Sequence, residues 1–278
     1  MSVSIVFLLF VIYSASGWIL EVIYCSIVSH RFINRGFLKG PLCPIYGVGG
    51  ILVIFALKPL SENVVILFIV ASIATSCLEY ATSCVLEFLF ATKWWDYSLN
   101  RFNINGRVCL LNTVVFGTTS VLVVYVIDPM LRLTLGRVPT GQLEAVTLCL
   151  FAVISFDLIS TVVTLSALDK TVFDLKSFTK DLYSKTGDIS WFDPYRLDAS
   201  LVRLRNLSKS EASETNKELL ERFENVLRQS RGMQRIFRSF PAMQNRKHDF
   251  RLDSFTKMRT HDKCFADTAE AVEAASAP

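Results

Sequence analysis

Lysine and arginine are absent from five long stretches of this 278-residue sequence. Only nine of its 29 basic residues precede residue 169, and the other twenty lie in the last 110 residues. Stretches without a basic residue that are dominated by Leu, Ile, Val and Phe can cross a bilayer when they reach about 20 residues. The uneven charge therefore excludes a single globular core. It indicates a transmembrane domain over 1–168, followed by a charged C-terminal region over 169–278.

Motifs that bind nucleotides or nucleic acids are also missing. The glycines of residues 136–143 have the spacing of a P-loop, but Gln142 stands where the lysine is required and no strand precedes it. The net charge of +4 is too small to indicate nucleic-acid binding, so we expect no nucleic-acid partner. A basic region beside a bilayer is more consistent with contacts to membrane lipids.

Catalytic and metal-binding motifs are missing as well. The three histidines are scattered, and the seven cysteines have no metal-ligand spacing. We interpret the cysteines as small buried hydrophobic side chains. We therefore expect no cofactor and favour a protein that is not an enzyme. An intramembrane acid–base site that uses Glu79 and Asp157 stays open as an alternative.

The apolar stretches predict an all-α polytopic membrane protein with about five transmembrane helices. A signal peptide is the competing interpretation of the first stretch, but residues 1–4 carry no basic residue and the apolar run is too long. The fourth predicted span is closed by Asp128-Pro129. We see no internal repeat in the sequence. The predicted spans are 3–28, 41–57, 64–90, 111–131 and 143–168.

Five spans place the two termini on opposite sides of the membrane. The loops 29–39 and 91–110 carry six Lys and Arg residues, whereas the loops 58–63 and 132–142 carry three. Cytoplasmic loops have an excess of Lys and Arg, so this bias favours an N-terminus outside and a cytoplasmic C-terminus. The expected location is the bacterial plasma membrane.

The C-terminal region combines a predicted helix with a low-complexity end. Apolar residues recur at helical spacing over 215–240, and Thr215 with Glu218 forms a capping box. The polar face of this helix carries both signs of charge, which favours contact with protein over contact with lipid alone. Residues 260–278 are rich in Ala and Glu, and we expect them to be disordered.

A polar stripe runs along the third predicted span. Its residues are separated by three or four positions, so at about 100° per residue they share one face of the helix. A face with two carboxylates cannot lie against lipid, and it must look into protein or a wet interior. The stripe consists of Ser72, Ser76, Glu79, Ser83 and Glu87.

Glu21, Glu79 and Asp157 are carboxylates within three different predicted spans. With the topology above they fall at a similar depth in the inner half of the membrane. Each would cost about 2.5–3.5 kcal/mol at the centre of a lipid-exposed helix, so we expect them to share a polar path. Their counter-charge would be Arg107 from the following loop, a proton, a metal cation or a cationic substrate. The alternative is that the carboxyls are protonated and only hydrogen-bond across helices.

Two further segments invite a functional interpretation. The prolines and glycines of 41–50 fit either a broken helix whose backbone lines a site, or a helix start at the interface with glycine packing. The loop after the third span could orient carboxylates or bind a lipid head group, or it could be an ordinary interfacial turn. Its candidate residues are Trp94, Trp95, Asp96, Asn105, Gly106, Arg107 and Asn112.

These motifs carry a family resemblance. The runs NRGFLKGPLCPIYGVGG, EYATSCVLEFLFATKWWDYS and FNINGRVCLLNTVVFG resemble the CmpB-type ABC-transporter permeases, also called ABC-transporter type IV. The match covers about residues 5–168. The resemblance implies a permease-like membrane protein of bacteria, which would require a separate ATPase subunit and oligomerisation, for instance as a homo-oligomer.

The sequence thus leads to a transport hypothesis. The chain would be a membrane permease or transporter subunit with a carboxylate-lined intramembrane path for a cation, a proton or a basic solute. The alternative is a membrane-embedded regulatory or scaffold protein that recruits partners through its cytoplasmic C-terminal region.

Overall fold

The fold is taken from a computed structural model of the whole chain. The ranges that it describes are 2–30, 32–186, 197–210, 220–225, 233–240, 243–245 and 250–251.

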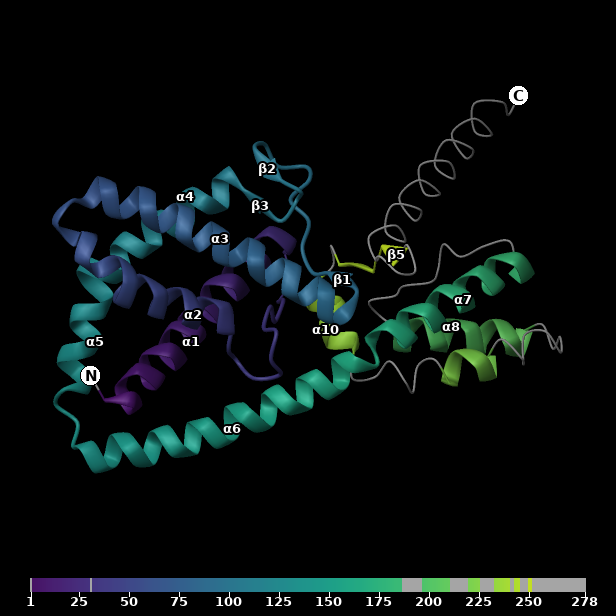
Figure 1. Cartoon of the computed structure of the whole chain (residues 1–278). Helices are drawn as coiled ribbons and strands as arrows, with labels where there is room; N and C mark the ends of the chain where they lie inside the picture. The colour runs from purple at the N-terminus through teal and green to yellow at the C-terminus, as the bar shows by residue number, and fades with distance from the viewer. Residues whose placement is uncertain are drawn as a thin grey trace, which may run out of the picture. The chain divides into compact units, whose positions relative to one another are not determined.

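Helices dominate the described residues, and five of them are long and apolar enough to cross a membrane (Figure 1). This confirms the expected all-α fold with about five candidate transmembrane helices. Their bounds are Val3–Ser29 for α1, Pro44–Leu52 continued by η1 and η2 to Glu62, Val64–Phe90 for α3, Leu110–Leu122 for α4 continued by η3 and α5 to Leu135, and Thr140–Ser166 for α6. Two short strands, β2 (Asn103–Ile104) and β3 (Val108–Cys109), form a hairpin between α3 and α4.

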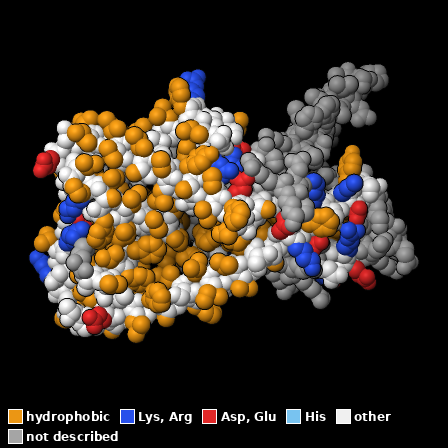
Figure 2. All heavy atoms as spheres, viewed as in Figure 1, with side chains coloured by type: hydrophobic (Ala, Val, Ile, Leu, Met, Phe, Trp, Pro, Cys, Tyr) orange, Lys and Arg blue, Asp and Glu red, His pale blue; other side chains and the backbone are white. Residues whose placement is uncertain are grey.

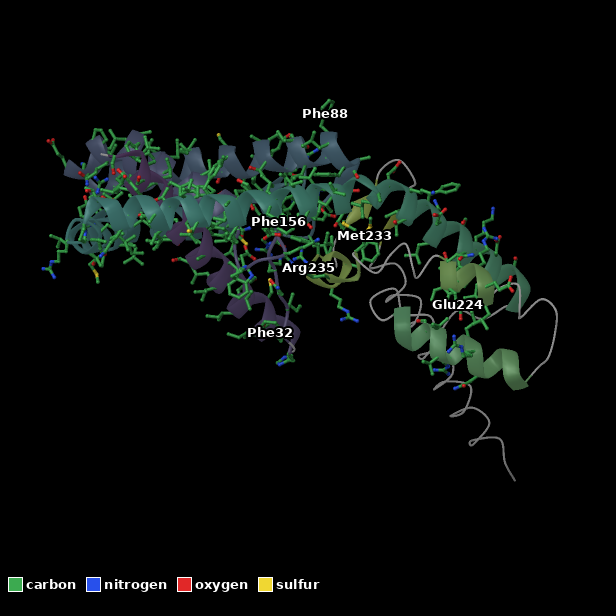
Figure 3. All side chains as sticks on the ribbon, turned by 90° about the horizontal axis from the view of Figure 1, so that it is seen from below. Phe32, Phe88, Phe156, Glu224, Met233 and Arg235 are labelled. Atoms are coloured by element: carbon green, nitrogen blue, oxygen red, sulfur yellow. The ribbon has the colours of Figure 1, made fainter. Side chains whose placement is uncertain are left out.

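The long helices expose apolar side chains, as expected where lipid is the solvent. The first of them begins at Ser2, whose hydroxyl accepts a hydrogen bond from the backbone N–H of Ile5 at 3.4 Å. Hydrophobic side chains cover much of the visible face of the helices (Figure 2). Phe88 projects away from α3 and is 88% exposed (Figure 3). Cys77 and Cys149 are also exposed, so the prediction that cysteines are buried fails at these two positions.

The second and fourth spans each contain a π-helical turn before a proline. These turns are η1 (Val53–Leu57), followed by the 3-10 turn η2 (Lys58–Glu62), and η3 (Val123–Ile127), followed by α5 (Asp128–Leu135). A π turn widens the helix, which leaves room for a proline that lacks a backbone N–H. For this reason the fourth span does not end at Asp128-Pro129 and continues to Leu135.

The chain divides into two compact units. The first, here called the membrane unit, comprises Met1–Leu89 and Trp95–Val163. The second, the tail unit, comprises Phe90–Trp94 and Thr164–Pro278. The tail unit therefore includes Phe90, which is the last residue of α3, and the next four residues, in addition to the C-terminal region.

The tail unit has a small aromatic core of its own. Its elements are β1 (Thr92–Lys93), α7 (Leu168–Thr186), α8 (Leu197–Ser210), α10 (Gln234–Ser239), β4 (Gln244–Asn245) and β5 (Phe250–Arg251). β1 pairs with β4, Trp94 packs edge-on against Phe240 with ring centroids 5.0 Å apart, and Phe178 stacks on Phe223 at 4.7 Å. Of the predicted helix over 215–240, residues 220–225 and α10 are helical, while 215–219 and 226–232 lie outside the described residues.

The membrane unit packs its helices through glycines. A Cβ on Gly47 of α2 would lie 2.2 Å from the Ser14 Oγ and 2.6 Å from the Phe10 ring of α1. A Cβ on Gly117 of α4 would lie 1.9 Å from the Ser72 Oγ of α3. Both glycines therefore set the closest approach between neighbouring helices, as small residues do in membranes.

We expect Gly47→Ala and Gly117→Ala to lower the thermal stability of the purified chain, because overpacking costs about 1–3 kcal/mol. Gly141→Ala is the matched control, since nothing lies within 4 Å of a Cβ at that position. Adding Ser72→Ala to Gly117→Ala should restore part of the loss by removing the nearest clashing atom. Equal unfolding temperatures for all of these variants would contradict the packing.

Candidate functional site

The segment between α1 and α2 returns along α1 and does not simply connect the ends of two helices. The backbone N–H of Ile33 donates to the Ser26 Oγ at 3.0 Å, and that of Cys43 donates to the Ser14 carbonyl at 3.0 Å. Ser14 lies 15 residues before the end of α1, or about 22 Å at 1.5 Å per residue. α2 therefore starts level with the middle of α1. α2 is a continuous helix from Pro44 and its glycines pack against α1, as the helix-start interpretation of 41–50 predicts, although the helix starts beside the middle of α1.

The segment between α3 and α4 returns in a similar way. Thr113, in the first turn of α4, shares a hydrogen bond of 2.8 Å with Ser76 of α3. The Asn112 side chain faces Glu79, which lies 11 residues before the end of α3. α4 thus also starts about 16 Å from the end of its preceding helix. Non-helical backbone at this depth is tolerated only where it is buried in protein or lines a polar interior.

Glu21 of α1 has three polar neighbours near the start of α2. Tyr46, in the first turn of α2, donates its hydroxyl to Glu21 Oε1 at 2.7 Å. Arg35 from the returning segment places its Nε 3.7 Å from Glu21 Oε2, and the Cys25 Sγ lies 3.8 Å from the same oxygen. Glu21 of α1 therefore has a counter-charge, Arg35, in the segment that connects α1 to α2.

Glu79 of α3 is more deeply buried than Glu21 and has fewer partners. It is 5% exposed, and the Tyr97 hydroxyl donates to its Oε1 at 3.3 Å. Its Oε2 is buried and has no hydrogen-bond partner among the described residues. An unsatisfied buried carboxylate oxygen is costly, so this atom is the strongest indication of a ligand or a proton in the membrane unit.

The charges of Glu21 and Glu79 both affect the pKa of Tyr97. Burial raises the pKa of the Tyr97 hydroxyl above its usual range, and the charges of Glu79 and then Glu21 raise it further. Tyr97 therefore stays protonated and serves as a hydrogen-bond donor. Both carboxylates are thus near enough to Tyr97 for their charges to affect it, whereas Asp157 is not among the charges that act on Tyr97.

Asp157 has other partners. Its two carboxylate oxygens accept the backbone N–H groups of Lys39 at 3.1 Å and Gly40 at 2.8 Å. The Lys39 Nζ lies 2.5 Å from the Ser160 Oγ, one turn further along α6. Asp157 therefore holds the segment before α2 against α6. This segment also positions Arg35 beside Glu21.

The far end of the polar stripe on α3 is neutralised by Arg107. Its Nη2 lies 2.5 Å from Glu87 Oε2, and its Nη1 donates to the Ser83 Oγ at 2.9 Å. The guanidinium also lies over the Tyr80 ring, 5.6 Å from the centroid. Arg107 was one of the expected counter-charges for the carboxylate cluster. It pairs with Glu87, so that charge is not available to Glu79.

The other residues of the loop motif support this arrangement. The Trp95 indole donates to the Arg107 carbonyl at 2.8 Å, and the Asn105 amide donates to the Tyr80 hydroxyl at 3.0 Å. Asn105 and Gly106 adopt the left-handed conformation with φ of 53° and 64°. Asp96 accepts from the Ser98 backbone at 3.1 Å, whereas Trp94 lies in the core of the tail unit.

A buried ion-pair network that the sequence did not predict lies at the opposite end of the helices. Asp128 is fully buried, and Lys58 reaches its Oδ2 at 2.9 Å while the Arg132 Nε reaches its Oδ1 at 2.7 Å. The sequence interpretation treated Asp128-Pro129 as a helix end and Lys58 as part of a turn. Both residues directly precede a proline, and this shared position was the clue available in the sequence.

Within the described residues, no group of three His, Cys, Asp or Glu side chains is placed to hold a metal ion.

Comparison with known proteins gives one family match. A family model described as "Putative ABC-transporter type IV" matches residues 8–162, which is more than half of the 278 residues. No curated protein and no solved structure matches the chain.

We expect Arg107→Met to destabilise the chain by about 3–5 kcal/mol, because it removes one partner of a largely buried ion pair and the hydrogen bond to Ser83. Adding Glu87→Gln should recover much of that loss. Arg101→Met is the control, since Arg101 belongs to the same loop and is exposed. Thermal unfolding of the wild type and these three variants in detergent measures the effect, and an unfolding temperature of Arg107→Met no lower than that of the control would refute the pairing.

Proposed function

Because the chain belongs to the ABC-transporter type IV family, and because its five apolar helices fit a multi-pass membrane transporter subunit, we propose that an ion or solute crosses the membrane along a path inside its membrane unit. In this proposal Glu21 and Glu79 bind a cation, a proton or a basic group of the transported solute. Ser76, Ser83, Glu87 and Asp157 line or brace the same polar interior.

The buried Oε2 of Glu79 carries this proposal. A carboxylate in this position needs either a proton or a cation, since the basic side chains nearby have other partners. Arg35 lies beside Glu21 and Arg107 pairs with Glu87. Ionisable groups inside membranes commonly mark ion or substrate paths, which supports this interpretation.

The starts of α2 and α4 support an ionised carboxylate. Tyr46 is the third residue of α2 and Asn112 the third residue of α4, and each faces one of the two glutamates. A helix N-terminus carries a partial positive charge of about half an elementary charge, which stabilises a nearby anion. Interrupted helices that meet charged groups near the middle of the bilayer are a common device of transporters.

Two partners follow from the transporter assignment. The sequence has no nucleotide-binding motif, so an ABC-type subunit of this kind would draw on a separate ATPase. Because five spans are few for a complete permease, we also propose that the chain works as an oligomer, with membrane lipids around its exposed apolar faces.

The distribution of basic residues supports an orientation. Arg35, Lys39 and Arg107 belong to the returning segments, which together with the adjoining residues hold six Lys and Arg residues against three in the opposite loops. We propose on this basis that the returning segments and the C-terminus face the cytoplasm and that the N-terminus is outside.

We expect Glu79→Gln to leave expression and thermal stability nearly unchanged, because glutamine keeps the shape of the side chain. The same variant should abolish the stabilisation that cations or pH changes give to the purified chain. At about ten times Kd such a ligand raises the unfolding temperature by about 3–6 °C.

The control for this experiment is Glu144→Gln, since Glu144 is exposed on α6. Unfolding temperatures are measured for the full chain in lipid nanodiscs, over a pH series and with alkali cations and small basic solutes. If every ligand and pH effect is the same in Glu79→Gln as in the wild type, Glu79 is not part of the path.

A further inference from the structure

A sequence repeat becomes visible once α1 and α3 are compared. Both helices contain Leu-Phe, then Ser four residues after the Phe, then Leu-Glu six and seven residues after the Ser. A constant offset of 58 residues relates the two helices. It pairs Leu9 with Leu67, Phe10 with Phe68, Ser14 with Ser72, Leu20 with Leu78 and Glu21 with Glu79.

The helices that follow repeat as well, with a constant offset of 70 residues. Both enter a π-helical turn at a valine, and both reach a proline six residues later. The offset pairs Tyr46 with Phe116, Gly47 with Gly117, Leu52 with Leu122, Val53 with Val123 and Pro59 with Pro129. The larger offset means that the second connecting segment is 12 residues longer, and this difference hid the repeat from the sequence interpretation.

The contacts between the helices repeat together with the sequence. Gly47 approaches Phe10 and Ser14 in the first pair of helices, and Gly117 approaches Phe68 and Ser72 in the second. The Ser14 and Ser72 hydroxyls are also both buried without a hydrogen-bond partner among the described residues. α1–α2 and α3–α4 are therefore two copies of one helical hairpin that run in the same direction.

Equivalent residues of the two copies meet each other. The rings of Tyr46 and Phe116 pack edge-on with centroids 6.0 Å apart. Lys58 and Asp128, which are equivalent at an offset of 70, form an ion pair at 2.9 Å. Contacts between equivalent residues occur where a two-fold axis passes, so α2 and α4 meet around a pseudo-two-fold axis. Glu21 and Glu79 are the two related carboxylates on either side of it.

The two copies differ at the residues that surround their glutamate. Glu21 receives a hydrogen bond from the Tyr46 hydroxyl and has Arg35 beside it. In the second copy Phe116 replaces Tyr46 and has no hydroxyl, and Asn105 stands at an offset of 70 from Arg35. Asn105 donates to Tyr80. The arginine of the second connecting segment, Arg107, pairs with Glu87. Glu79 accepts a hydrogen bond from Tyr97 and forms no ion pair with a Lys or Arg of the described residues.

We propose that a cationic group with N–H donors, of the guanidinium or ammonium class, binds Glu79 Oε2 in the position that Arg35 occupies beside Glu21. The first copy shows in its own residues what this type of carboxylate site accepts. Guanidinium and ammonium groups form short, charge-assisted hydrogen bonds with carboxylates. This inference rests on the proposed path and names the class of solute that uses it.

The test measures the thermal unfolding of the purified full chain in lipid nanodiscs with methylguanidinium and methylammonium. Potassium and tetramethylammonium, which have no N–H donor, are added at equal ionic strength. We expect the two N–H cations to raise the unfolding temperature of the wild type and of Glu144→Gln by several degrees. The shift should vanish in Glu79→Gln.

Phe116→Tyr is a second variant that follows from the repeat. It gives the second copy the hydroxyl that Tyr46 supplies in the first, so a protein donor should compete for Glu79. We expect it to fold normally and to weaken the apparent affinity for methylguanidinium about 3–10-fold, in proportion to a hydrogen bond of about 0.5–1.5 kcal/mol.

Three results would overturn the inference: no shift with either N–H cation, a shift that persists in Glu79→Gln, or an equal shift with potassium or tetramethylammonium. In the last case, a potassium or pH effect that still depends on Glu79 would leave the proposed cation path standing. Loss of every Glu79-dependent effect would remove both proposals.

Discussion

The membrane unit depends on one constraint, which is that charges and non-helical backbone between apolar helices must find their partners within the protein. Glu21, Glu79, Glu87 and Asp157 are four of the carboxylates in its long helices, and the connecting segments turn back along these helices and bring an arginine or two backbone N–H groups to three of these four. Arg35 reaches Glu21, Arg107 reaches Glu87, and the backbone at Lys39 and Gly40 reaches Asp157. α2 and α4 start deep in the unit because these segments occupy the space in front of them. The fourth carboxylate, Glu79, has an oxygen without a hydrogen-bond partner among the described residues, and our proposal that it binds a ligand rests on this difference.

Much of the fold follows from composition, since uncharged apolar runs of this length predict membrane-crossing helices. The stripe on α3 could also be predicted, because helical spacing places Glu79, Ser83 and Glu87 on one face. Which cation meets which carboxylate could not be predicted. The pairing of Arg107 with Glu87 depends on how far its loop turns back along α3. Likewise, sequence spacing gives no hint that Asp157 binds the backbone of a segment more than 100 residues away.

The repeat was missed for a physical reason. Its two copies share few identical residues because lipid-facing positions accept any large apolar side chain, and their connecting segments differ by 12 residues. Two features recur in both copies. A glycine packs against a serine and a phenylalanine, and a π-helical turn precedes a proline. Asp128-Pro129 resembled a helix end in the sequence. The π turn that precedes the proline and accommodates it is not visible there.

The central claim is that Glu79, a buried carboxylate, pairs with a cation when the ligand binds. Infrared difference spectroscopy of the full chain, recorded before and after methylguanidinium is added, reports changes in carboxyl and carboxylate bands directly. We expect a carboxylate band change in the wild type that is absent from the Glu79→Gln spectrum and retained in the Glu144→Gln spectrum. An identical difference spectrum in Glu79→Gln would show that the ligand acts elsewhere and would contradict the account.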